Sequence, residues 1–223
     1  MPLTFKYLDV PFGLGGRGGV QRFFLLAHNI DFTEELVELS DWGATEKARV
    51  LSSGENPCAA LPIIYNVDSN NNNNESPHLI QHVAALRYLA RVHGITKDNT
   101  AYEEYVQDLV ADEYQSFRDM WARIAFEGSD DEKAKYKTEQ VPPILEKFDK
   151  LYAKYKLEES FLSVSKTDGQ PLWADAGLYG LLRDNMITGF LTMEDLKEKY
   201  SHLATMFEAF GSIPAVKEWV DKQ

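Results

Sequence analysis

Residues 56–95, NPCAALPIIYNVDSNNNNNESPHLIQHVAALRYLARVHGI, decide how the rest of the chain is interpreted. They open with an apolar run, residues 60–65, that has Pro62 near its start. Because proline lacks a backbone donor, a strand tolerates it at its first residue and not in its middle. A proline that opens a strand in a tight turn is also where cis peptide bonds occur. A cis Leu61–Pro62 bond would leave the N–H and C=O of Leu61 free to pair with an outside peptide.

The second half of this stretch predicts a helix. Gln81 and His82 precede residues 83–91, VAALRYLAR, whose good helix formers and apolar spacing are typical of an amphipathic helix. A helix N-terminus with side-chain donors beside it can bind an anion. The stretch therefore offers a strand edge for a peptide backbone and a helix end for a carboxylate.

Composition limits the classes of function. The chain has 223 residues, of which 44% are hydrophobic and 12% aromatic, enough for a folded core in one large or two small domains. Its formal net charge of −12 argues against nucleic acid or an anionic membrane surface as a partner, since binders of these need clustered Lys and Arg. The histidines are scattered and have no cysteine partner, so we predict no metal site.

The number of cysteines and the N-terminal residues indicate the cellular compartment. Cys58 is the single cysteine, which rules out an internal disulfide and fits a reducing compartment. No apolar run reaches the ~18–20 residues of a membrane span. The start, MPLTF, lacks the basic region and apolar core of a signal peptide. We therefore predict a soluble, cytoplasmic protein, with Cys58 as a small packed residue rather than a nucleophile.

The first part of the chain has the alternating pattern of strands. Residues 3–10, LTFKYLDV, predict a strand that carries Tyr7, and residues 30–37 predict a second one. Within the quoted stretch, residues 63–67 and 78–80 predict two more strands.

A glycine-rich loop, residues 12–19, leads into a helix predicted over residues 20–28. Gly13, Gly15 and Gly18 formally satisfy the dinucleotide-binding pattern G-x-G-x-x-G. We reject that fold, because it requires several further strand–helix repeats that the later sequence does not supply.

The apolar period changes from two to 3.6 in the second part of the chain. Apolar side chains recur at helical spacing over residues 102–126, prolines stand in the first turn of a helix predicted at residues 141–145, and residues 173–179 open a nearly all-apolar helix that should be buried. We therefore predict an α/β domain over residues 1–94 and an all-helical domain over residues 102–223.

Three motifs, L-P-I-I-Y at residues 61–65, Q-H…R-Y-L at residues 81–89 and W-A-D at residues 173–175, resemble the cytosolic glutathione transferase family. The resemblance covers nearly the whole chain and implies a thioredoxin-like N-terminal domain followed by an all-helical C-terminal domain. It also implies a homodimer that binds glutathione as a co-substrate between these domains. The implied reaction joins the glutathione thiolate to a hydrophobic electrophile.

The resemblance assigns roles to individual residues. The family's strand-end tyrosine matches Tyr7, whose hydroxyl would stabilise the thiolate by donating a hydrogen bond to sulfur. Leu61, before the proline, would pair with the cysteinyl main chain of glutathione. Gln81 and His82 stand where a Gln-Ser pair holds the glutamyl end. This use of tyrosine is most similar to the sigma, alpha, mu and pi groups, sigma most of all.

The full set of glutathione-binding residues that the resemblance implies is Arg17, Trp42, Lys47, Leu61, Pro62, Gln81, His82 and Asp108. Trp42 and Lys47 would contact the glycyl end. Asp108 would reach from the helical domain to the glutamyl amine bound in the partner subunit.

The chain also departs from the family pattern around the site. His82 replaces the usual serine, and Gly19 replaces a glutamate. Residues 10–13 are an insertion between Tyr7 and Arg17. These departures favour an alternative, a non-enzymatic glutathione-transferase-like structural, ligand-carrying or scaffolding protein. The retained Tyr7, Arg17, Trp42 and Gln81 favour the enzyme.

Simpler roles stand beside the functional ones. Tyr7 could be a strand aromatic, Trp42 a packing residue and Asp108 a solvated acid. Side chains expected near the hydrophobic co-substrate are Phe12, Leu14, Tyr114 and Trp121. The asparagine run at residues 70–74 is expected at the tip of a surface loop without a functional role.

Overall fold

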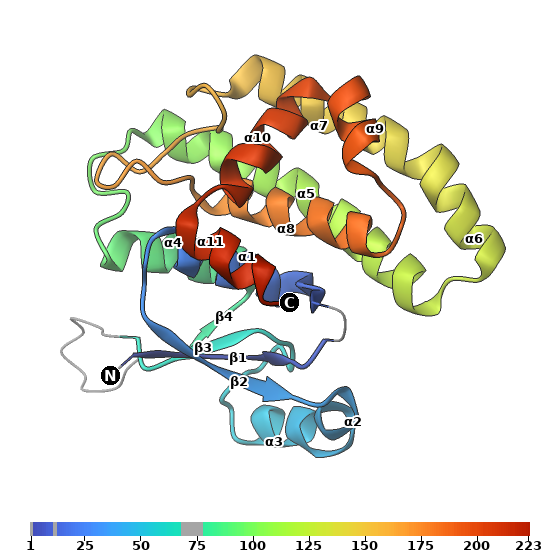
Figure 1. The fold of residues 1–223 in the computed structure, drawn as a ribbon. Coiled ribbons are helices and arrows are strands. Elements are labelled where there is room, and N and C mark those ends of the chain that lie inside the picture. The colour runs from blue at the N-terminus through green and yellow to red at the C-terminus, as the bar shows by residue number, and fades with distance from the viewer. Residues whose placement is uncertain (1, 11–12, 68–77) are drawn as a thin grey trace.

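The computed structural model describes residues 2–10, 13–67 and 78–223, and it contains a sheet-bearing part and a helical part (Figure 1). The strands are β1 (Leu3–Leu8), β2 (Phe32–Val37), β3 (Ile63–Tyr65) and β4 (Leu79–Ile80). The helices of the first part are α1 (Gly16–Ala27), α2 (Leu39–Asp41), the π-helical turn η2 (Trp42–Glu46), α3 (Lys47–Ser52) and α4 (His82–Val92). Those of the second part are α5 (Ala101–Glu127), α6 (Asp130–Lys135), the π-helical turn η3 (Tyr136–Gln140), α7 (Val141–Tyr155), α8 (Trp173–Ile187), α9 (Met193–Lys199), α10 (Ser201–Gly211) and α11 (Pro214–Asp221).

The sheet has the strand order β2-β1-β3-β4. β1 and β2 are parallel, with Leu3 opposite Phe32 and Leu8 opposite Val37, and the other neighbours are antiparallel. Parallel strands need a crossover connection, and α1 supplies it here. Helices α2 and α3 lie on one side of the sheet, and α1 and α4 lie on the other, toward the helical part (Figure 1). This arrangement confirms the predicted fold class, an α/β part followed by an all-helical part.

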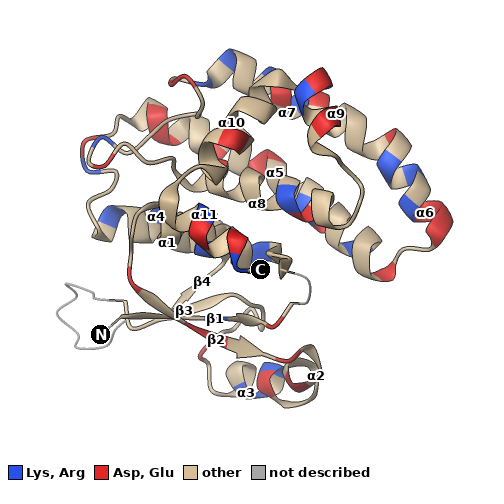
Figure 2. Cartoon of the chain, viewed as in Figure 1, with Lys and Arg blue, Asp and Glu red and all other residues tan. Residues whose placement is uncertain are grey.

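Acidic and basic residues are interspersed along the helices rather than sorted onto separate elements (Figure 2). Several form pairs one turn apart, such as Lys150 with Glu146 and Lys199 with Asp195. This is the pattern of solvated helix faces. In the ranges that the structure describes, no helix combines the length and apolarity that crossing a membrane requires.

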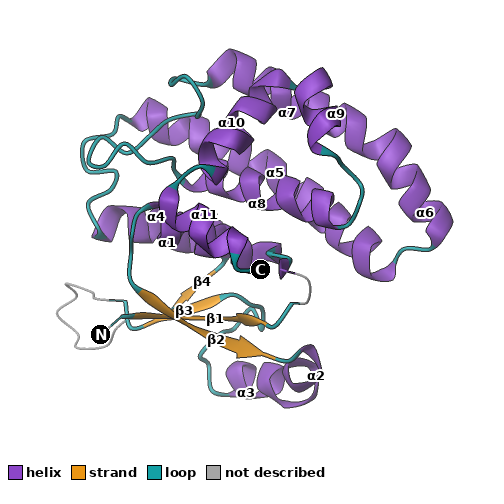
Figure 3. Ribbon diagram, viewed as in Figure 1, coloured by secondary structure: helices purple, strands orange, loops and turns teal. Residues whose placement is uncertain are grey.

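Helix α8 is the centre of the helical part and packs against α1, α5 and α10 (Figure 3). Most of its residues are buried, as the sequence predicts. Asp175 in its first turn accepts hydrogen bonds from Tyr152 at 2.7 Å, Gln107 at 2.8 Å and the Leu162 N–H at 3.2 Å. Burial raises the pKa of Asp175 to about 6, against the opposing effect of these donors. Asp175 therefore ties α8 to α5, α7 and the segment before it.

One apolar core runs through both parts of the chain. It includes Phe5 and Phe24 from the sheet-bearing part, and Tyr114, Trp121 and Leu178 from the helical part. The division into domains at residues 1–94 and 102–223 stays a prediction, because the two parts share this core.

One local expectation is corrected. Helix α1 begins at Gly16 and not at residue 20, so Arg17 lies in its first turn. Glycine is a poor helix former, but side chains elsewhere in the fold accept the N–H groups of this first turn and so stabilise it. The predictions for residues 70–74 and Phe12 lie outside the described residues.

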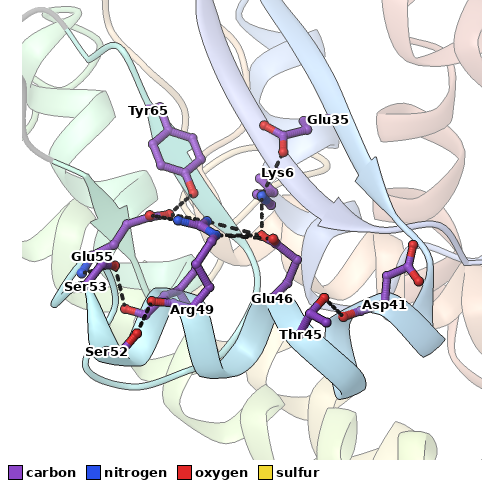
Figure 4. Close-up of polar contacts among 11 residues, drawn as sticks. Lys6, Glu35, Asp41, Thr45, Glu46, Arg49, Ser52, Ser53, Glu55 and Tyr65 are labelled. Carbon is purple, nitrogen blue, oxygen red and sulfur yellow. Dashed lines mark hydrogen bonds and ion pairs between the residues drawn. The ribbon is translucent and has the colours of Figure 1, made fainter.

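A polar network fastens η2 and α3 to the sheet (Figure 4). The buried Lys6 of β1 pairs with Glu35 at 2.7 Å and Glu46 at 3.0 Å. Arg49 of α3 then connects Glu46, at 3.2 Å, to Glu55, at 2.7 Å. The segment that leads toward residue 60 is thereby held in place from the outer side of the sheet.

Candidate functional site

A cavity of about 380 Å³ lies where the sheet-bearing part meets α5. It is lined by Arg17, Cys58, Ala60, Leu61, Pro62, Ile80, Gln81, His82, Gln115 and Asp119. Five of the predicted glutathione-binding residues, which come from three separate places in the sequence, thus face one space. A larger cavity of about 900 Å³, around His28 and Asp168 near the other end of β1, contains none of the predicted site residues.

The Leu61–Pro62 peptide bond is cis, which was one of the two forms the sequence left open. Asn56, which is fully buried, holds the preceding turn: its side chain donates to the Ala60 C=O at 2.5 Å and accepts from the Cys58 N–H at 3.0 Å. Within the described part of the chain, no hydrogen bond to the main chain of Leu61 is found. A peptide lying in the cavity could therefore pair with it as a further strand would.

Gln81 and His82 form the start of α4. Gln81 is the N-terminal flanking residue, exposed and with a φ of 65°, and His82 is buried. The His82 Nε2 lies against the Tyr114 hydroxyl and 3.1 Å from the Gln115 amide. Burial lowers the pKa of His82 to about 3, helped by the positive charges of Arg17 and Arg118. The imidazole is therefore neutral.

The tautomer of His82 follows from its two neighbours. A tyrosine hydroxyl and an amide nitrogen can both donate, so Nε2 is the accepting nitrogen and Nδ1 carries the proton. His82 thus keeps one N–H donor, which is what the serine of the family motif would provide.

Tyr7 lies beneath the first turn of α1 and does not line the cavity. The residue is 7% exposed, and a Cβ placed on Gly16 or Gly18 would overlap the tyrosine side chain. The Tyr7 oxygen accepts the Arg17 N–H at 3.1 Å. Burial raises the pKa of Tyr7 above its ordinary value, while the N–H groups of Gly18 and Arg17 and the charge of Arg118 act in the opposite direction. The hydroxyl therefore sits directly behind Arg17, which does line the cavity.

Three further predicted residues do not reach this cavity. Trp42 packs with Val37, Val50 and Ile63 in a small apolar cluster, the simpler role that the sequence left open for it. Lys47 is exposed at the start of α3. Asp108 accepts from the Trp173 Nε1 at 3.1 Å and lies 3.4 Å from Arg87, so it is tied into its own surroundings rather than simply solvated.

The expectation for Cys58 was wrong. It is exposed and lines the cavity instead of packing as a small apolar residue, because the buried Asn56 holds the turn so that Cys58 faces outward. Sequence reasoning also missed Gln115 and Asp119 of α5, which line the cavity one helical turn apart. Their spacing of four was the available signal, since residues four apart share a helix face.

The side chains expected near a hydrophobic co-substrate are deeply buried where the structure describes them. Leu14, Tyr114 and Trp121 all belong to the core, and the Tyr114 hydroxyl is engaged with His82. Trp121 Nε1 donates to Thr188 at 3.2 Å. These residues support the site from within, and the place of the co-substrate stays a prediction.

Comparisons with known proteins give a consistent result. Residues 115–223 match the family model of the glutathione S-transferase C-terminal domain. Glutathione S-transferase S1 of Drosophila melanogaster is 23% identical over 226 residues, covering 100% of this chain and 80% of its own.

Solved structures have the same fold. The Pi-class glutathione S-transferase of Onchocerca volvulus superposes with a TM-score of 0.72 at 22% identity, covering 100% of this chain and 93% of its own. Prostaglandin synthase D of Nilaparvata lugens gives a TM-score of 0.70 at 21% identity, covering 100% and 98%. The glutathione S-transferase from Ascaris lumbricoides gives 0.72 at 23% identity, covering 100% and 97%.

Proposed function

We propose that this chain, which belongs to the glutathione transferase family, binds glutathione in the cavity beside the cis Leu61–Pro62 bond and conjugates its sulfur to hydrophobic electrophiles. One observation carries the proposal: Arg17, Leu61, Pro62, Gln81 and His82 line the same cavity. A peptide edge, an amide, an imidazole N–H and a guanidinium are the groups that a short anionic peptide requires.

The binding proposal gives each part of glutathione a partner. The N–H and C=O of Leu61 pair with the cysteinyl residue, and Gln81 and the Nδ1–H of His82 hold the glutamyl carboxylate. The side chain of Arg17, which is 43% exposed, adds a positive charge at the cavity. Contacts of Trp42 and Lys47 with the glycyl end, and of Asp108 with glutathione in a partner subunit, remain predictions.

In the proposed reaction, Tyr7 stabilises the thiolate. Its oxygen accepts the Arg17 N–H, so its own proton is free to be donated toward sulfur. The thiol loses its proton to solvent, and the sulfur lone pair then forms a bond to the electrophilic carbon. The leaving group departs with its electron pair, or, for an addition, the adjacent carbon takes up a proton.

A specific observation favours the second candidate, a non-enzymatic member of the family that binds without turnover. Tyr7 is covered by the first turn of α1 and does not line the cavity. A protein that binds glutathione and leaves Tyr7 covered would be a carrier or scaffold. A homodimer and a cytoplasmic location are proposed from the family resemblance and are checked by light scattering and cell fractionation.

The test combines binding and turnover. Retention on immobilised glutathione is compared between the wild type and Gln81→Ala, and conjugation to a chloronitrobenzene between the wild type and Tyr7→Phe. We expect retention of the wild type only, and a loss of kcat on the order of tenfold to a hundredfold in Tyr7→Phe with KM for glutathione nearly unchanged. Binding without turnover would favour the carrier or scaffold. A wild type that is not retained would contradict the proposal.

A further inference from the structure

The N-terminal turn of α1 is held by a carboxylate from the opposite part of the chain. Asp184 of α8 accepts the Gly15 N–H at 2.7 Å with one oxygen and the Gly16 N–H at 3.0 Å with the other. The second oxygen also accepts from a guanidinium nitrogen of Arg118 on α5. We call Asp184, Arg118 and residues 15–17 the clamp.

The clamp is buried and charged. The side chains of Asp184 and Arg118 are each 1% exposed. Arg118 Nε and its second terminal nitrogen have no hydrogen-bond partner in the described part of the chain, although its guanidinium lies 5.1 Å from the ring centre of Trp121. A buried cation with unused donors is costly, so packing alone does not explain its presence.

Four N–H groups at the start of α1 have hydrogen-bond partners within the protein. Asp184 accepts those of Gly15 and Gly16, Tyr7 accepts that of Arg17, and the Gly19 N–H returns to the Gly15 C=O at 2.6 Å. The N-terminus of a helix normally attracts an outside anion through these groups. Here the carboxylate of Asp184 occupies that position in place of an outside anion.

We propose that Asp184, held by Arg118, is a positioning residue that fixes the Gly15–Arg17 turn over Tyr7 and so sets where the Tyr7 hydroxyl and Arg17 meet the glutathione sulfur. The inference rests on the proposed function. The turn needs this support because Gly16 has a φ of +54° and glycines give it no side-chain packing of its own. Without the carboxylate, the first turn of α1 loosens and the Arg17 N–H no longer stays on Tyr7.

The experiment compares two buried aspartates of the same helix. Asp184→Asn removes the charge of the clamp, whereas Asp175→Asn, the control, changes a fully buried carboxylate that bonds only within the helical part. Asp184→Asn leaves Arg118 as an unpaired buried charge and could unfold the protein for that reason alone. A third variant, Asp184→Asn with Arg118→Gln, removes both charges and so avoids this problem. For each full-length variant we measure kcat and KM for glutathione, and amide hydrogen exchange in residues 15–18.

We expect Asp184→Asn and the double variant to lower kcat by about tenfold or more with KM for glutathione within about twofold, because Leu61, Gln81 and His82, which hold the peptide, are untouched while the reacting group is misplaced. Exchange in residues 15–18 accelerates in both and stays as in the wild type in Asp175→Asn. Unchanged kcat together with unchanged exchange would overturn the inference. If the wild type itself lacks turnover, the proposed function fails, and exchange alone then decides whether the clamp exists.

Discussion

The two walls of the candidate site are built in different ways. On one wall, Leu61, Pro62, Gln81 and His82 meet at the cavity as the sequence predicts. On the other, Tyr7 is covered by α1 and the N–H groups of that helix start are taken by internal partners. The first wall is open for a ligand, and the second is closed by the protein itself.

The difference follows from how far apart the deciding residues are in the chain. The first wall is set by neighbours: Asn56 shapes the turn before Leu61, and Gln81 begins the helix that His82 enters. The second wall is set by Asp184, which lies 169 residues from the Gly15 that it holds. The conformation of the turn before Leu61 is fixed by residues a few positions away. The conformation of the glycine-rich segment before α1 is fixed by a residue that is distant in the sequence.

The largest effect on stability is expected from removing the buried cation of the closed wall. Arg118→Met leaves Asp184 buried without its cation, so we expect the free energy of unfolding to fall by about 3–5 kcal/mol. The comparison is Arg17→Met, which removes an exposed partner of Asp119 and should cost less than about 1 kcal/mol. Denaturant midpoints of the two variants measure the contrast. Equal losses in the free energy of unfolding would show that the buried pair contributes no more to stability than the exposed pair.

A smaller effect comes from filling the space between α1 and Tyr7. A Cβ on Gly18 would overlap the Tyr7 ring, so Gly18→Ala should lower the free energy of unfolding by about 1–3 kcal/mol. Gly19→Ala is the control, since its Cβ would meet only Phe23 at 3.6 Å and should be neutral or stabilising by up to about 1 kcal/mol. Thermal unfolding of both variants tests this, and a harmless Gly18→Ala would mean that Tyr7 moves aside easily.

The sequence could predict most of the fold and one wall of the site. Pro62 marks a strand start, and the shift from alternating to helical spacing marks the helical part, because both patterns reflect short-range geometry. It did not reveal the clamp, although two signals were present. Asp184 lies in the nearly all-apolar helix α8, and Arg118 lies between Phe117 and Trp121 on a buried stripe of α5. A buried charge is costly unless an opposite charge lies beside it. Pairing Arg118 with Asp184 would therefore have placed α5 beside α8.

The open wall can be tested through the protonation of His82. Its pKa in the folded chain, about 3, lies below the 6.5 of an ordinary histidine, so the unfolded state binds more protons between these values. Stability should therefore fall as the pH drops from about 6.5 toward 3, with a contribution of up to about 1.4 kcal/mol per pH unit from this residue. Denaturant unfolding of the wild type and His82→Gln at several pH values measures it. A slope that is the same in both proteins would mean that the pKa of His82 is not lowered by folding.

The smallest effect concerns the place where the two walls meet. Arg17 of α1 pairs with Asp119 of α5 across the cavity, and their side chains are 43% and 59% exposed. Asp119→Asn should therefore change the free energy of unfolding by less than about 1 kcal/mol. Because the carboxylate of Asp119 repels the carboxylates of glutathione and occupies Arg17, its removal should tighten glutathione binding by roughly two- to fivefold at low salt. Glu113→Gln is the matched control, since it removes the partner of Lys147 from the same helix, and this pair does not line the cavity. Calorimetric titration with glutathione distinguishes the outcomes. Weaker binding in Asp119→Asn would mean that the pair holds Arg17 in place for glutathione. Both walls of the cavity would then contribute to binding, rather than the open wall alone.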